Sequence, residues 1–262
     1  ACTGTVIDTA IVDNMTLWHG LLTKLNKNGD TIWQKNYFDT MSLWYGSRMG
    51  IHAIHETIDH GFVLSGWSRG DVQHEIQHVL IKTDSLGNIQ WLKTQGHTGN
   101  GINPYSVDQT IDSGFIVAGK YWNGVHYDGW FYKTDQYGNK EWEKFMGGPY
   151  DDWSQDAIAT SDGNIACVLT DEDIYYPQDH SNIKIIKLSL SGSVIWQKTK
   201  SFNWSEEGTS IIELDDNSLV CSGKTQVVDS INLVSGYNAF IMKFNSFGDS
   251  VWKREFNYID RK

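Results

Sequence analysis

Short apolar runs recur along the chain every 51 to 58 residues, and each is followed by a polar turn and an alternating segment centred on tryptophan. The five tryptophans are Trp33, Trp91, Trp142, Trp196 and Trp252. In every copy a lysine lies nine residues before the tryptophan, a glycine four residues before it, and a lysine or arginine two residues after it. A pattern kept in all five copies indicates a tandem-repeat fold.

The apolar runs are typical of strands. LLTKL, VLIK and WFYK are too short for helices and rich in aliphatic or aromatic residues. The segment after each lysine, as in Asn26–Asp30 and Asp84–Asn88, has Asx at its start and glycine near its end, which predicts a tight β-hairpin. A second turn and apolar strand follow the first four copies. These turns carry Asp59, Asp112, Asp162 and Asp216.

About four strands per copy predict an all-β, five-bladed β-propeller in one domain, 1–262. The expected blades are 17–68, 77–121, 130–170, 183–225, and 238–262 together with 1–12. The last blade lacks its later strands, so the N-terminal strand is expected to join the C-terminal hairpin and close the ring, which removes two exposed sheet edges. A four-bladed ring with an extra flap and a flattened sandwich are the alternatives.

GNIQWLK, TIDSGFIVAG and FMGGPYDD (145–152) resemble a tandem-repeat β-propeller family of secreted and surface proteins. The family is of the Bacteroidetes type and loosely related to quinoprotein-like propellers. The resemblance covers nearly the whole chain, although Gly-Gly after the tryptophan survives only as Gly147-Gly148. It implies a propeller fold and a binding or scaffold role that is secreted or at the cell surface.

The composition of the chain excludes some classes of binding partner. The 262 residues include 21 basic and 32 acidic side chains, a formal charge of −11, with no basic run, which disfavours nucleic acid. No apolar run is long enough for a membrane span. Ala1-Cys2 has the form of a lipoprotein cleavage remnant, so Cys2 is a candidate lipid anchor. Cys167 and Cys221 lie in apolar runs and are expected to be buried free thiols.

A residue present in every copy is expected to build the blade, and a residue present once is free to form a site. The repeat tryptophans are therefore interpreted as wedges between blades, with the repeat lysines laying their stems on the rings and their ammonium groups at a blade edge. The candidate ligand-binding residues are the aromatic and acidic residues outside the repeat pattern. They are Trp44, Tyr45, Tyr105, Trp122, Trp153, Trp204, Asp151 and Asp152.

Aromatic rings flanked by acids and amides are what sugar recognition needs. The sequence therefore predicts a non-enzymatic extracellular or cell-surface binding module, with a glycan favoured over a protein ligand and no cofactor. A structural or assembly subunit that uses the propeller faces is the alternative, and a glycoside hydrolase with carboxylates on the axis is a third. Asp171 and Asp173 are secondary candidates for calcium, without the remaining EF-hand spacing.

Overall fold

The computed structural model describes residues 2–12, 15–37, 48–69, 76–96, 101–173, 180–202, 205–229 and 234–256. These ranges form strands and turns, as expected for an all-β chain. No helix suited to crossing a bilayer occurs in them.

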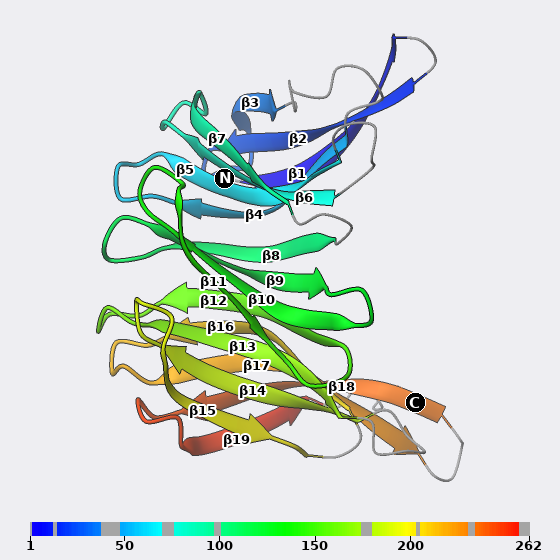
Figure 1. The fold of residues 1–262 in the computed structure, drawn as a ribbon, viewed down its shortest axis with the longest axis vertical. Helices are drawn as coiled ribbons and strands as arrows, with labels where there is room; N and C mark the ends of the chain where they lie inside the picture. The colour runs from blue at the N-terminus through cyan, green and yellow to red at the C-terminus, as the bar shows by residue number, and fades with distance from the viewer. Residues whose placement is uncertain are drawn as a thin grey trace.

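Five successive groups of strands follow one another along the molecule (Figure 1). The first is β1 (Cys2–Val12), β2 (Met15–Leu25) and β3 (Thr31–Tyr37). The second is β4 (Arg48–Glu56), β5 (Phe62–Arg69), β6 (Ile76–Thr83) and β7 (Ile89–Gln95). The third is β8 (Ile102–Gln109), β9 (Phe115–Trp122), β10 (Tyr127–Thr134) and β11 (Lys140–Met146).

The fourth group is β12 (Asp152–Ala159), β13 (Ile165–Asp173), β14 (His180–Leu188) and β15 (Val194–Lys200). The fifth is β16 (Glu206–Glu213), β17 (Leu219–Asp229), β18 (Val234–Phe244) and β19 (Ser250–Phe256). The last four groups are antiparallel in chain order. One parallel bridge, Trp18 with Arg48, joins the first group to the second. Each group therefore corresponds to a propeller blade.

The expected blade boundaries differ from these sheets by one hairpin. The second-element strand β5 pairs forward with β6, the first strand of the next tryptophan hairpin. Each tryptophan hairpin is therefore the outer half of a blade, and blades two to five span 48–95, 102–146, 152–200 and 206–256. A range such as 77–121 joins strands of two different sheets, because the repeat pattern gives the period and not the point at which a sheet ends.

The expected pairing of the N-terminal strand with the C-terminal hairpin is wrong. β1 pairs antiparallel with β2, its neighbour in sequence, and β18 pairs with β17 and β19. Pairing with an adjacent strand closes a much shorter loop and costs less entropy than joining the two ends of the chain. Figure 1 shows the first and last sheets at opposite ends of the molecule, so the described part of the chain is an open row of blades.

The predicted hairpins are confirmed. The turn glycine has a positive φ in all five copies, at Gly29, Gly87, Gly138, Gly192 and Gly248. Its amide donates to the carbonyl of the Asx that opens the turn, or of Ser189 in the fourth copy. The local pattern was therefore sufficient to specify this turn.

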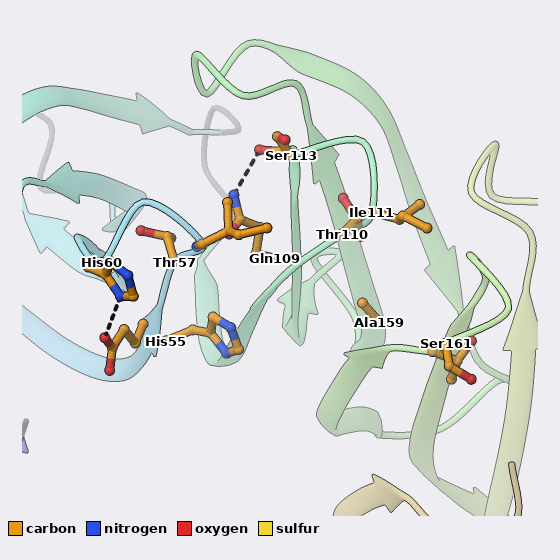
Figure 2. A pocket seen from close by; sticks show the side chains of 12 residues that line it. His55, Thr57, His60, Gln109, Thr110, Ile111, Ser113, Ala159 and Ser161 are labelled. Carbon is orange, nitrogen blue, oxygen red and sulfur yellow. Dashed lines mark hydrogen bonds and ion pairs between the residues drawn. The ribbon is translucent and has the colours of Figure 1, made fainter. Parts of the chain in front are cut away.

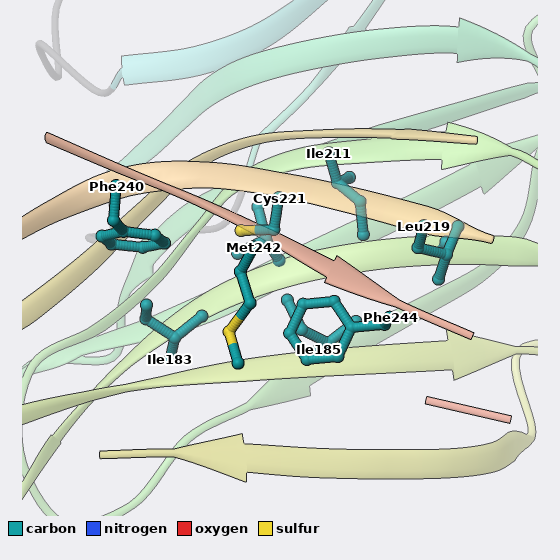
Figure 3. Close-up of a cluster of buried hydrophobic side chains, with 10 residues drawn as sticks. Ile183, Ile185, Ile211, Leu219, Cys221, Phe240, Met242 and Phe244 are labelled. Atoms are coloured by element: carbon teal, nitrogen blue, oxygen red, sulfur yellow. The ribbon is translucent and has the colours of Figure 1, made fainter. Parts of the chain in front are cut away.

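The hydrophobic core lies between neighbouring blades. In the last interface, β14 supplies Ile183 and Ile185, and β18 supplies Phe240, Met242 and Phe244 (Figure 3). Cys221 lies in this cluster and Cys167 in the preceding one, and both are buried free thiols, as expected.

The tryptophan rings reach across the same interfaces. A Cβ built on the turn glycine of the next blade would lie within 3.0 Å of the ring in each of four cases. The pairs are Trp33 with Gly87, Trp91 with Gly138, Trp142 with Gly192 and Trp196 with Gly248. Only glycine leaves room for a ring this close to the backbone.

Candidate functional site

The non-repeat candidates gather at one end of the blades, where the first strands begin. Tyr105 lies on β8, Trp122 at the end of β9, and Asp151, Asp152 and Trp153 at the start of β12. The antiparallel registers place the end of β9 beside the start of β8. Trp44, Tyr45 and Trp204 lie outside the described residues.

Tyr127, the first residue of β10, contacts two of these candidates, Trp122 and Asp151. Its ring meets that of Trp122 edge to face, with 5.0 Å between centroids. Its backbone N–H donates to Asp151 Oδ1 at 2.8 Å. The Lys120 ammonium lies 4.0 Å from the centre of the Tyr127 ring, a cation–π contact. Tyr105, Trp122, Tyr127 and Asp151 are called the aromatic site below.

Burial, and then the charges of Tyr127 and Glu207, raise the pKa of the Tyr105 phenol to about 12. The phenol is therefore neutral at physiological pH, when it can both donate and accept a hydrogen bond.

Tyr105 occupies a position that recurs in the first strand of each four-stranded blade. Pairing with the second strand shifts by one residue there, which leaves one extra residue on the first strand. These extra residues are His52, Tyr105, Gln155 and Thr209. Each is at least partly exposed, so four different side chains form a row across four blades.

The next blade contributes to this row. Gln155 Nε2 donates to Glu207 Oε1 at 3.3 Å, and Lys224 Nζ lies 2.8 Å from Glu207 Oε2. Trp153 precedes its register shift by two residues, as Glu207 does in the following blade. Trp153 and Glu207 therefore hold equivalent positions in neighbouring blades.

Asp152 has a different role from the expected ligand contact. Its side chain is fully buried, and its carboxylate accepts the N–H groups of Gly148, at 2.6 Å, and Glu172, at 3.2 Å. Burial, together with the neighbouring Asp171 carboxyl, raises its pKa well above the usual range. Asp152 thus holds the 147–151 connection that carries Asp151, without itself being open to a ligand.

The two calcium candidates, Asp171 and Asp173, do not belong to a group of metal-binding side chains among the described residues. Asp171 accepts a hydrogen bond from Lys184 Nζ at 2.6 Å, which occupies it with a cation of the protein. Asp173 ends β13, opposite His180. Among the described residues, no three His, Cys, Asp or Glu side chains are grouped so as to hold a metal ion.

A hollow of about 740 Å³ lies at the opposite ends of the same strands (Figure 2). It is lined by His55, Gln109 and the second-element turns of three blades, with Ile58 and Ile111 largely exposed. His55 Nδ1 lies 2.9 Å from Asp108 Oδ1, and this hydrogen bond raises the pKa of His55 against the opposing effect of burial. Thr57, Thr110 and Thr160 hold equivalent positions in the second turns of three blades, and all three line this hollow. The hollow is therefore a consequence of the repeat and not of residues special to one blade.

Sequence reasoning missed Tyr127, Gln155, Glu207 and Lys120 as parts of the site. Tyr127 stands in the segment YWNGVHYDGW beside the chosen Trp122, and that proximity was the available signal. Gln155 and Glu207 depend on the register shift and on contacts between blades about 50 residues apart in sequence. A pattern of neighbouring residues cannot predict contacts between positions so far apart in sequence.

No protein-family model and no curated protein matches the chain. Solved structures do match. The NanB sialidase from Streptococcus pneumoniae has a TM-score of 0.51 at 12% identity, over 95% of this chain and 37% of that one. A putative glycoside hydrolase from Parabacteroides distasonis has 0.43 at 8% identity, over 90% and 81%. A eukaryotic initiation factor has 0.39 at 10% identity, over 92% and 60%.

These likenesses concern the fold. The sialidase comparison supports a propeller-like arrangement of the sheets, and this chain spans little more than a third of the sialidase.

Proposed function

We propose that the protein is a non-enzymatic glycan-binding module that acts outside the cell or at its surface. The observation that carries the proposal is that Tyr127 contacts the Trp122 ring of its own blade and donates a hydrogen bond from its backbone N–H to Asp151 of the next blade, which places two aromatic rings near a carboxylate. A lipid anchor at Cys2 is part of the same proposal for location.

The chemistry of the aromatic site suits a sugar. Tyrosine and tryptophan rings present rigid apolar faces for the C–H groups of a pyranose, and each keeps a polar atom for hydrogen bonding. Lys120 adds a cation on the Tyr127 ring, and Gln155, hydrogen-bonded to Glu207, adds an amide and an acceptor in the row that includes Tyr105. Binding sites for small molecules combine such apolar surfaces with a few placed polar groups.

The same geometry favours binding over hydrolysis. A Tyr105 phenol with a pKa of about 12 is a weak nucleophile at neutral pH. Asp152 is the carboxyl in this region whose raised pKa would suit a general acid, but it is buried with both oxygens engaged by backbone amides. Geometry therefore keeps the protonated acid away from a bound sugar.

A glycan array followed by tryptophan fluorescence titration tests the proposal. We expect a glycan that quenches the wild-type emission, with affinity lowered at least tenfold by Trp122→Ala and by Trp153→Ala. Tyr105→Phe should weaken binding less, because it keeps the ring and removes one hydroxyl. Tyr137→Ala is the matched control, since Tyr137 is 61% exposed on a hairpin turn away from the site.

Equal effects of Tyr137→Ala and Trp122→Ala, or no bound glycan, would contradict the proposal. Release of reducing sugar from a bound glycan, lost on Glu207→Gln, would instead favour the hydrolase alternative.

A further inference from the structure

The outward face of β19 carries the same repeat residues that, in the earlier blades, are covered by the following blade. Trp252, Arg254 and Phe256 alternate along the strand, so they point to the same side of the sheet. All three are exposed, with 41% of Trp252 and 52% of Phe256 accessible. We call these three residues the tail face.

The equivalent residues of the first blade are Trp33, Lys35 and Tyr37, and the second blade covers them. The Trp33 ring lies against Gly87. Lys35 Nζ donates to Asn88 Oδ1 at 3.1 Å, and the Tyr37 hydroxyl donates to Gly87 O at 2.9 Å. As a result Tyr37 is only 3% exposed.

Later joints repeat the contact. Lys93 Nζ donates to Asn139 Oδ1 at 3.2 Å, and Lys198 Nζ forms an ion pair with Asp249 Oδ1 at 3.0 Å. All four joints thus have a tryptophan on a turn glycine. Three of them also have a cation on the Asx that follows that glycine, and Ser193 holds this position in the remaining joint. The tail face carries the first half of such a joint.

The first blade carries the second half. Its turn, Asn26–Asp30, has the same hydrogen bonds and the same positive-φ glycine as the others. A Cβ built on Gly29 would meet nothing within 4 Å, and Gly29 is exposed where Gly87, Gly138, Gly192 and Gly248 are buried. Asp30 follows Gly29 as Asp249 follows Gly248, and Asp249 is the residue that pairs with Lys198. Asp30 is exposed as well. We call residues 26–30 the head turn.

We propose that the tail face of one molecule docks on the head turn of a second copy, with Trp252 on Gly29 and Arg254 paired with Asp30. The charges are complementary. The tryptophan contact repeats one that is present four times within the chain, and the cation contact repeats one that is present three times. The two halves lie at opposite ends of the molecule in Figure 1, so one molecule in this conformation does not bring them together. A head-to-tail contact of this kind generates closed rings or filaments.

The proposal does not depend on glycan binding, and charge exchange tests it. Sedimentation velocity over a concentration series should show wild-type association. Arg254→Asp and Asp30→Arg should each weaken association at least tenfold, because each places like charges at the joint. The double variant should regain most of it, since its charges are again opposite. Asp215→Arg, on an exposed turn of the last blade, controls for the charge change and should associate normally.

Cross-linking identifies which molecules meet. In a Cys2→Ser background, Asp30→Cys with Arg254→Cys should give intermolecular products with a short bis-maleimide. Lys198→Cys with Asp249→Cys is the matched control, because those residues meet within one chain and should cross-link internally. Cys167 and Cys221 are buried and should not react.

Monomers at every concentration would overturn the proposal. So would a 30–254 product linked within one chain, or no product while the control pair reacts.

Discussion

The repeat lysines show how one position serves the whole scaffold. Lys82, Lys133 and Lys187 are at least 95% buried, and their ammonium groups pair with the second-turn acids Asp59, Asp112 and Asp162. The expected placement of these ammonium groups at a blade edge is therefore wrong for these three blades. Each lysine ties the outer hairpin of a blade to the turn between its first two strands. The aspartate and the lysine therefore recur together because they form one ion pair in each of these blades.

Breaking one of these pairs should be costly. Lys82 Nζ lies 2.8 Å from Asp59 Oδ2, and Asp59→Asn leaves the buried ammonium without its counter-ion. Removing one partner of a buried pair typically costs 3–5 kcal/mol, but the Asp59 side chain is 51% exposed, so we expect about 1–2 kcal/mol. Urea unfolding at pH 7 measures it. Lys82→Met combined with Asp59→Asn should recover most of the loss.

The same variant should change the response to acid. Burial raises the pKa of Asp59, but Lys82, Thr57 and the Gly61 amide outweigh it and lower the pKa to about 2. The folded protein therefore holds this proton less tightly than the unfolded chain, whose carboxyl titrates near 4. The stabilisation is complete above about pH 4 and is lost as the pH falls toward 2. Asp59→Asn should flatten this part of the stability profile, and an unchanged profile would contradict the ion-pair interpretation.

At the scale of the element, the tryptophan hairpin links one blade to the next. Trp91 packs on Phe115, with 5.8 Å between ring centroids, and against the Gly138 backbone of the following blade. Trp252 holds the same place in its hairpin without a following blade to cover it. Comparing Trp91 with Trp252 therefore separates the stability that the ring gives to its own hairpin from the stability that it gives to the joint between blades.

Trp91 is partly buried, so replacing it with Ala should lower the free energy of unfolding by an amount near the lower end of the ~3–5 kcal/mol typical of buried aromatic truncations. Trp252→Ala should cost less than about 1 kcal/mol, because 41% of Trp252 is already exposed and no following blade covers it. Denaturant unfolding at low protein concentration, where association is absent, compares the two. Equal losses would show that the ring stabilises its own hairpin rather than the joint.

Element-level reasoning from sequence succeeded where the determinant was local. The Asx-x-x-Gly-Asx turns and short apolar strands were predictable because each depends on a few neighbouring residues. The blade boundaries were not, because β5 reads equally well as the end of one unit or the middle of the next. The aromatic site was predictable as a group of non-repeat aromatics. The hub Tyr127 and the row through Tyr105 and Gln155 were not, since they depend on register shifts between strands.

At the scale of the whole molecule, stability should follow the order of the blades. Contacts between sheets run from each first strand to the next, through β1, β4, β8, β12 and β16. The second, third and fourth blades are packed on both sides, and the first and fifth on one. In such a linear array each unit is stabilised mainly by its neighbours, so the ends open first.

Native-state hydrogen exchange should resolve this gradient. We expect the slowest amides in β9, β10, β13 and β14, faster exchange in β17 and β18, and the fastest in β2, which belongs to the three-strand group at the end of the row. A ring closed within one chain would instead protect β17 as strongly as β13, because both would be packed on two sides. Raising the protein concentration provides the second comparison. If copies join head to tail, protection should rise in β2 and β18 while the central strands stay unchanged, and Arg254→Asp should abolish that rise without altering the gradient at low concentration.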